Sequence, residues 1–89
     1  MATSPVSNPD VEVSAVRAEI TGDELRVELS DGRVVAVSMA RLAWLRWLRE
    51  ASDAQRENWS IEPGGFAVYW PDLDDGVEVR HLLSLAPLS

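Results

Sequence analysis

Hydrophobic and polar residues alternate along three segments in the first half of the chain, which predicts three consecutive β-strands. The first segment starts near Val11 and changes phase at Val16, so we expect a bulge or a strand buried on both faces in its middle. The second segment, residues 25–29, is joined to the third, residues 34–37, by an Asp-Gly dipeptide that favours a hairpin turn. These tight connections predict an antiparallel meander.

The next segment changes to helical spacing. Over residues 39–51 the apolar side chains recur three or four positions apart, which predicts an amphipathic helix that ends near Glu50. Ser52 and Gln55 then have the spacing of a capping box, in which each side chain binds a backbone N–H near the other residue. A second, short helix is therefore expected over residues 53–58.

The run that begins at Phe66 predicts a strand with one buried face. Its alternation places Phe66, Val68 and Trp70 on the side of the core. Pro71 removes a backbone donor and favours an extended conformation for the residue before it, so strand pairing is expected to stop there.

Two further segments complete the expected fold. Residues 59–61 are expected to begin a fourth strand that pairs with the fifth, and residues 77–85 are apolar enough to dock as a short strand or a helical turn. The pattern predicts an α+β domain with an antiparallel sheet of about five strands, and with one or two helices packed on one face.

With 89 residues, the chain is expected to form one domain near the lower size limit for independent folding. Residues 1–9 predict a disordered tail, residues 10–86 the α+β domain, and residues 87–89 a short C-terminal tail. The absence of cysteine excludes disulfides and thiolate metal sites. No run resembles a signal peptide or a membrane span, so a cytoplasmic location is expected.

Charge narrows the class of partner. Eight arginines, with no lysine, stand against fifteen acids, and the net charge is −7. Phosphate backbones repel such a chain, so direct nucleic-acid binding is not expected, whereas a basic partner protein would be attracted to it.

Candidate chemistry is sparse. The acidic run that starts at Asp72 resembles the start of a calcium loop, but glycine falls at position five and Leu83 at position twelve, so the ligand spacing is wrong. His81 is the only histidine, and nothing in the sequence places a nucleophile beside it, so a surface or partly packed histidine is expected. The sequence therefore indicates no catalytic residue, no metal and no cofactor.

Four tryptophans are present in this short chain. Trp44 and Trp47 lie on one face of the expected helix, where core packing explains them. Because tryptophan is also enriched at interfaces, one of the four is expected to lie at a binding surface.

These elements and motifs together resemble a bacterial family catalogued as domain of unknown function twenty-four forty-two, over residues 11–85. The residues that carry the resemblance are Ala51, Ser52, Gln55, Arg56, Asn58, Trp59, Trp70, Pro71, Leu73, Asp74, Leu82 and Leu83. The resemblance implies an antitoxin-like or regulatory module, since members are commonly encoded beside another small protein in toxin–antitoxin-like pairs. It implies no catalytic residue.

The expected function is that of a non-enzymatic, acidic protein-binding module that covers the basic surface of a small partner, as an antitoxin covers a toxin. The residues expected to contact the partner are Asp72, Asp74, Asp75, Glu57 and the exposed side of Trp70. The alternative is a self-associating, homodimeric structural or regulatory domain that reaches DNA only through another protein. A small hydrolase has no support in the sequence.

Overall fold

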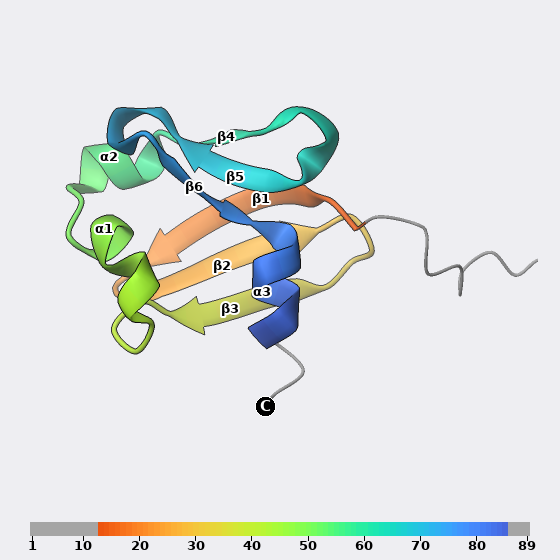
Figure 1. The fold of residues 1–89 in the computed structure, drawn as a ribbon, viewed down its shortest axis with the longest axis horizontal. Helices are drawn as coiled ribbons and strands as arrows, with labels where there is room; N and C mark the ends of the chain where they lie inside the picture. The colour runs from red at the N-terminus through yellow and green to blue at the C-terminus, as the bar shows by residue number, and fades with distance from the viewer. Residues whose placement is uncertain (1–12, 86–89) are drawn as a thin grey trace, which may run out of the picture.

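Two three-stranded antiparallel sheets organise the chain in this computed structural model, which describes residues 13–85 (Figure 1). The first sheet has the order β1-β2-β3, and the second has the order β4-β5-β6. The strands are β1 (Ala15–Thr21), β2 (Glu24–Leu29), β3 (Val34–Ser38), β4 (Ser60–Ile61), β5 (Ala67–Trp70) and β6 (Asp75–Glu78). The α+β class and the N-terminal meander are confirmed, but the expectation of a single sheet is wrong.

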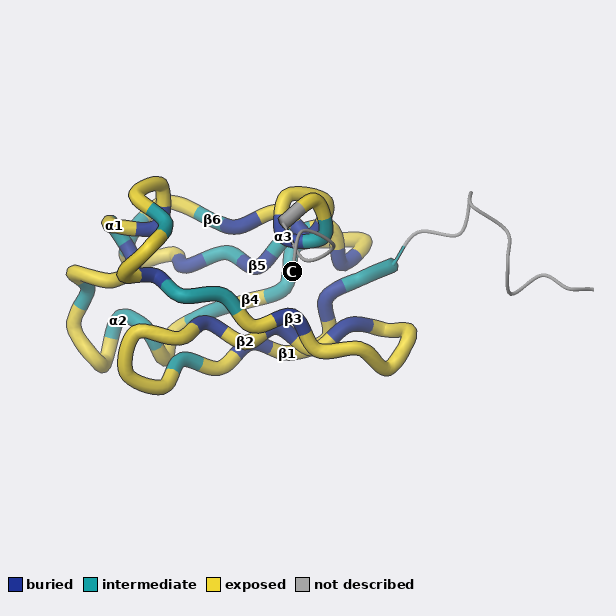
Figure 2. Tube along the Cα trace, turned by 90° about the horizontal axis from the view of Figure 1, so that it is seen from below, coloured by how far each residue is buried: buried dark blue, intermediate teal, exposed yellow. Residues whose placement is uncertain are grey.

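The second sheet is separate because the helical connection carries the chain away from the edge of the meander. This connection holds a 3₁₀ turn (Ala43–Leu45), helix α1 (Arg46–Arg49) and helix α2 (Asp53–Glu57). The later strands then pair with one another, and β1 contacts β4 and β5 where the two sheets meet. Figure 2 shows β5 and β6 as a layer distinct from β1, β2 and β3.

Alternation along β2 gives the first sheet a buried face and an exposed face. Three side chains of β2 are buried, and the residues between them are exposed. The pairing of β1 with β2 shifts register between Ala15 and Arg17, and Val16 is 56% exposed. This irregularity confirms the bulge that the change of phase at Val16 predicted.

A continuous helix over residues 39–51 does not form, so that expectation is wrong. Met39 is buried, and its N–H donates to the carbonyl oxygen of Asp23 at 2.7 Å, which ties it to the β1–β2 turn. Leu42 is still extended, with φ −110° and ψ 100°, so helical residues begin only after it. Leu45 and Leu48 are nevertheless fully buried, as the helical spacing predicted.

The capping box is confirmed at the start of α2. The Ser52 hydroxyl accepts from the Gln55 N–H at 3.2 Å, and the Gln55 side chain accepts from the Ser52 N–H at 2.9 Å. Asp53 in the first turn faces the positive end of the helix dipole. Local side-chain chemistry therefore starts this helix where the sequence predicts it.

Strand β5 begins one residue later than expected, which changes the position of Phe66. The turn Pro63–Gly65 precedes Phe66, whose backbone is helical with φ −79° and ψ −17°. The alternation therefore breaks at this residue, and its side chain is 52% exposed. Val68 and Trp70 are fully buried as predicted, but the expected burial of Phe66 is wrong.

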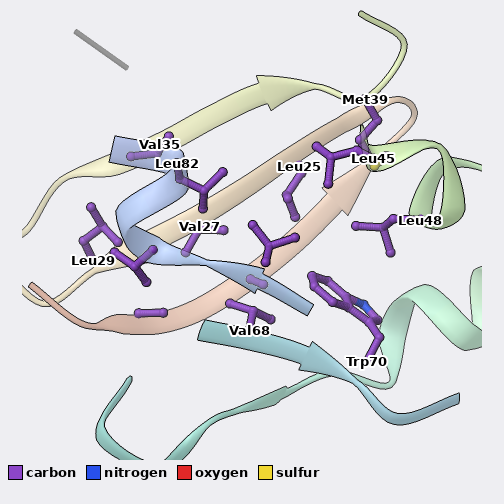
Figure 3. Packing of buried hydrophobic residues seen from close by; sticks show 14 residues of the cluster. Leu25, Val27, Leu29, Val35, Met39, Leu45, Leu48, Val68, Trp70 and Leu82 are labelled. Atoms are coloured by element: carbon purple, nitrogen blue, oxygen red, sulfur yellow. The ribbon is translucent and has the colours of Figure 1, made fainter. Parts of the chain in front are cut away.

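The C-terminal apolar segment forms both a strand and a helix, the two elements that the sequence predicts as alternatives. Its first residues extend β6, and helix α3 (Val79–Leu85) follows directly. Leu82 on α3 is fully buried and lies near Val27 and Val35 of the first sheet (Figure 3).

One hydrophobic core lies between the two sheets. The buried apolar residues are Ala15, Ala18, Leu25, Val27, Leu29, Val35, Met39, Leu45, Leu48, Val68, Trp70, Val77, Val79 and Leu82. Each sheet contributes its inward face, α1 contributes Leu48, and α3 contributes Leu82 (Figure 3).

The expected tails at residues 1–9 and 87–89 lie outside the described residues, as do the expected domain limits at 10 and 86. Within residues 13–85, no helix is both long enough and apolar enough to cross a membrane.

Candidate functional site

Charge is distributed unevenly along the folded chain. Residues 13–49 contain six arginines and five carboxylates, whereas residues 50–78, here called the acidic half, contain one arginine and eight carboxylates. The ion pairs of the described region are Arg17–Glu28, Arg26–Glu24, Arg33–Asp31 and Arg49–Asp23. No carboxylate of the acidic half forms an ion pair with any residue from 13 to 85.

Arg56, the one arginine of the acidic half, is directed to backbone carbonyls. Its guanidinium donates to the carbonyl oxygen of Leu48 at 3.2 Å, to that of Gly22 at 3.1 Å, and to that of Arg49. The hydrogen bonds of the guanidinium thus connect α2 to the end of α1 and to the β1–β2 turn. Because these bonds go to carbonyl oxygens, Arg56 forms no ion pair with a carboxylate among residues 13–85.

Trp70 is not available to a partner. It is fully buried, and its indole Nε1 donates to the carbonyl oxygen of Arg56 at 2.9 Å. Its ring also meets Trp47 edge to face, with centroids 5.9 Å apart and an interplanar angle of 72°. The expectation that one side of Trp70 is exposed is therefore wrong, because the alternation of β5 turns this side chain into the core (Figure 3).

Of the three aspartates of the predicted contact surface, Asp72 and Asp74 lie on the turn between β5 and β6, and Asp75 is the first residue of β6; all are exposed. Asp72 accepts from the Asn58 side chain at 3.1 Å, Asp74 accepts from the Tyr69 hydroxyl at 2.6 Å, and Asp75 accepts from the N–H of Gly76 at 2.8 Å. These bonds hold the turn in shape, including Asp74 at φ 51°. Each bond uses one carboxylate oxygen, so the group remains a source of negative charge at the surface.

Glu57 lies next to this turn. It is exposed at the end of α2, and the bond between Asn58 and Asp72 brings that end of the helix against the β5–β6 turn (Figure 1). A polar hollow beside α2 and β1 is lined by Ala18, Glu19, Ile20, Gly22, Asp53, Arg56, Glu57 and Trp59. The three aspartates therefore lie close together, Glu57 is the neighbour in sequence of Asn58, which bonds Asp72, and Trp70 is buried away from this surface.

The outer face of the second sheet holds a groove that the sequence did not predict. The groove has a volume of about 450 Å³ and is lined by Glu62, Pro63, Phe66, Ala67, Tyr69, Gly76 and Glu78. Ala67 pairs with Glu78 across β5 and β6, while the N–H of Glu62 donates to the carbonyl oxygen of Ala67 at 2.9 Å. Glu62 and Glu78 therefore flank Ala67 in one row across the sheet. This groove is called the outer groove below.

Tyr69 reports the electrostatic potential beside the outer groove. The hydrogen bond to Asp74 raises the pKa of the Tyr69 hydroxyl above its ordinary value of 10.0. Partial burial and the nearby charges of Asp74, Glu62 and Asp75 raise this pKa further. All these charged groups disfavour a phenolate, so they would favour a cation in the same place.

Gly76 lies so close to β5 that there is no room for a side chain beside Tyr69. A Cβ atom at this position would lie 2.7 Å from the carbonyl oxygen of Val68 and 3.5 Å from Cδ1 of the Tyr69 ring. Any side chain here would push the two strands or the ring apart. Glycine at this position therefore preserves the form of the groove.

The only histidine occupies a different surface. His81 is exposed, as the sequence predicted, and its ring stacks on Trp44 with centroids 4.7 Å apart and planes 10° apart. Trp44 is itself 36% exposed, so the expectation that it belongs to the core is wrong. The hydroxyl of Ser84 donates to the backbone carbonyl of His81 at 2.7 Å rather than to its ring. Across residues 13–85, no group of three or more potential metal ligands is present.

The sequence pattern does not reveal the outer groove, for two reasons. Alternation predicts that Phe66 lies on the core side, but the strand begins only at Ala67. Glu62 and Glu78 are distant in sequence, and only the register of the second sheet places them on both sides of Ala67. The available signal was the outward position of Ala67 and Tyr69 in the alternating run.

Comparison with known proteins identifies a family. The sequence profile described as "Protein of unknown function (DUF2442)" matches residues 13–87. A crystal structure of a protein of unknown function from Rhodospirillum rubrum ATCC 11170 is similar to this chain, with 28% sequence identity and a TM-score of 0.66. The match covers 83% of this chain and 88% of that protein's chain. No curated protein matches this sequence. The chain therefore belongs to the DUF2442 family.

Proposed function

We propose that this protein is a non-enzymatic binding module whose acidic half contacts a basic protein partner in the cytoplasm. The observation that carries the proposal is the imbalance between eight carboxylates and one arginine in residues 50–78, where that arginine is bonded to backbone carbonyls. The small basic toxin of an antitoxin-like pair is the class of partner that the family resemblance suggests.

Electrostatic complementarity explains how such a surface would act. Carboxylates without an ion pair among the described residues raise the local concentration of a basic partner, and they speed its encounter with the protein. They also repel acidic proteins and nucleic-acid backbones, which restricts the choice of partner. The turn 71–75 and the end of α2 present these charges on fixed backbone, so little ordering is needed on binding.

The proposal is tested by measuring binding to the product of the neighbouring gene by calorimetry at several salt concentrations. The double variant Asp53→Asn/Glu57→Gln removes two charges from the acidic half and is expected to weaken binding about tenfold. The matched control Glu24→Gln/Glu28→Gln removes two charges that already pair with arginines on the first sheet, and it is expected to bind nearly as the unchanged protein does. Equal effects of the two double variants, or an affinity independent of salt, would contradict the proposal.

Self-association is the second candidate, and the first sheet provides the observation that favours it. Val34 on β3 is 46% exposed, and β3 lies at the edge of its sheet. An edge strand with an exposed apolar side chain is suited to pairing with another copy. Size-exclusion chromatography with light scattering distinguishes the two candidate functions. A stable homodimer that does not bind the product of the neighbouring gene would favour self-association.

A further inference from the structure

We propose that the outer groove of the second sheet receives an arginine side chain from the basic partner. The inference rests on the proposed function and narrows it from a charged half of the molecule to one position on its surface. Three features carry it: the row of residues across the sheet, the aromatic side chains that line the groove, and the lack of an ion pair to its glutamates among residues 13–85.

The row Glu62, Ala67, Glu78 forms the acidic part of this position. Neighbouring residues in such a row are about 5 Å apart, so the two glutamates start about 10 Å from each other. The small side chain of Ala67 lies between them and leaves the space above it open to solvent. Neither glutamate has an ion pair among residues 13–85, and their mutual repulsion is relieved by a cation placed between them.

Aromatic side chains lie along the same groove. Phe66 is 52% exposed, and its ring lies against Gly64, where a Cβ atom would approach Cε2 of the ring to 2.6 Å. Tyr69 is half-buried, and its hydroxyl is held by Asp74 at 2.6 Å. Exposure of the Phe66 ring to water is unfavourable, and a cation with an apolar stem would cover this ring while its charge lies near Glu62 and Glu78.

Arginine matches this combination better than lysine does. Its guanidinium is planar, stacks on aromatic rings, and can bond two carboxylates through separate N–H groups. The lysine ammonium is compact and strongly hydrated, so it gains less from the rings. The occupant is therefore expected to be an arginine on an extended, basic segment of the partner.

The test uses three short, blocked peptides without tyrosine that differ only at the central residue, which is arginine, lysine or citrulline. Each is titrated into the ¹⁵N-labelled full chain, and binding is followed by shifts of the amide signals. The arginine peptide is expected to shift the signals of Phe66, Ala67, Tyr69 and Gly76 most strongly. Its affinity is expected to exceed that of the lysine peptide by about threefold and that of the uncharged citrulline peptide by about tenfold. Equal binding of all three peptides, or shifts centred on α2 or the first sheet, would overturn the proposal.

Variants locate the effect. Phe66→Ala and Glu62→Gln/Glu78→Gln change exposed or half-buried side chains, and each is expected to weaken arginine-peptide binding about fivefold or more. Glu24→Gln/Glu28→Gln is the control, because it also removes two negative charges, and it is expected to change arginine-peptide binding little. Unchanged circular dichroism spectra establish that each variant is folded.

The two proposals can fail separately. If Asp53→Asn/Glu57→Gln weakens binding of the partner protein while the groove variants do not, the groove proposal is wrong and the proposed function stands. If arginine peptides bind in the groove but neither Asp53→Asn/Glu57→Gln nor Glu62→Gln/Glu78→Gln weakens binding of the neighbouring gene's product, the groove is an arginine site and the proposed function is wrong.

Discussion

Arg56 connects three parts of the molecule through its side chain and its backbone. The guanidinium donates to carbonyls at the end of α1 and in the β1–β2 turn, and its own carbonyl accepts from the indole of Trp70. The planar fork of arginine is what allows several carbonyls to be bonded at once. Lysine would retain the charge but would lose at least one of these bonds.

Arg56→Lys is therefore expected to lower the free energy of unfolding by about 2 kcal/mol, since hydrogen bonds from charged donors contribute about 1.5–3 kcal/mol each. Urea denaturation followed by tryptophan fluorescence measures the change. Arg33→Lys is the control, because Arg33 pairs only with Asp31 at an exposed turn, and it is expected to change stability by less than about 0.5 kcal/mol. Equal effects of the two substitutions would contradict the structural role given to Arg56.

Tyr69 offers a spectroscopic test of the potential near the outer groove, because it is the only tyrosine in the chain. Its pKa is raised in the folded protein, first by the hydrogen bond to Asp74, so the neutral phenol is favoured by folding. The resulting stability is present below the ordinary value of 10.0 and is lost as the pH rises through the higher folded pKa. Absorbance titration of the phenolate is expected to show Asp74→Asn moving the pKa back toward 10.0. A midpoint at or below 10.0 in the unchanged protein would contradict this account.

At the scale of elements, the turn before β5 depends on close contact with the start of β1. Gly65 has φ +74°, and a Cβ atom there would lie 2.5 Å from Cβ of Ser14. The Ser14 hydroxyl also donates to the carbonyl oxygen of Gly64 at 3.2 Å. The turn and the first strand therefore hold each other in position.

Gly65→Ala is expected to lower the free energy of unfolding by about 3 kcal/mol, because it adds a steric clash to the cost of a left-handed backbone. Gly22→Ala is the matched control. Gly22 also has positive φ, +60°, but a Cβ atom there meets nothing within 4 Å, so only the backbone cost of about 1 kcal/mol is expected. Thermal or urea denaturation of both variants checks the difference, and equal losses would show that the contact with Ser14 is unimportant.

The elements that the sequence predicts correctly are those set by local chemistry. The bulge at Val16, the hairpin turn and the Ser52–Gln55 capping box each depend on residues close in sequence. The errors arise where a distant contact decides. The N–H of Met39 bonds the carbonyl oxygen of Asp23, so the first helix begins later than predicted. The last three strands pair with one another instead of extending the meander.

The candidate site divides in the same way. Exposure of the acids at positions 57, 72, 74 and 75 follows from their polarity, and the structure agrees. The alternation of β5 predicts that Trp70 is buried. Since the side chain is fully buried, no part of it can contact a partner. The outer groove depends on which residues of neighbouring strands lie opposite each other. Periodicity along one strand indicates the face on which a side chain lies, but it does not name the residue opposite.

At the scale of the whole molecule, the surplus of negative charge in residues 50–78 is a source of internal repulsion. The exposed ion pairs lie outside this segment and add little stability, so screening is expected to relieve more repulsion than it removes attraction. Raising the salt concentration from about 10 mM to about 300 mM is therefore expected to increase the free energy of unfolding by about 0.5–1 kcal/mol. Urea denaturation at each salt concentration provides the measurement, and a fall in stability would show that the ion pairs dominate.

The second sheet keeps its inward side chains, such as Val68 and Trp70, apart from the outward residues Glu62, Ala67 and Glu78. Substitutions of Glu62, Ala67 and Glu78 leave the buried side chains in place, so the partner contacts proposed above can change while the fold is kept. On the proposed function, two related proteins would then need very few substitutions to stop binding each other's partners. Under that function, the alternation of a four-residue strand would thus keep the partner pairs of related proteins separate within one cell.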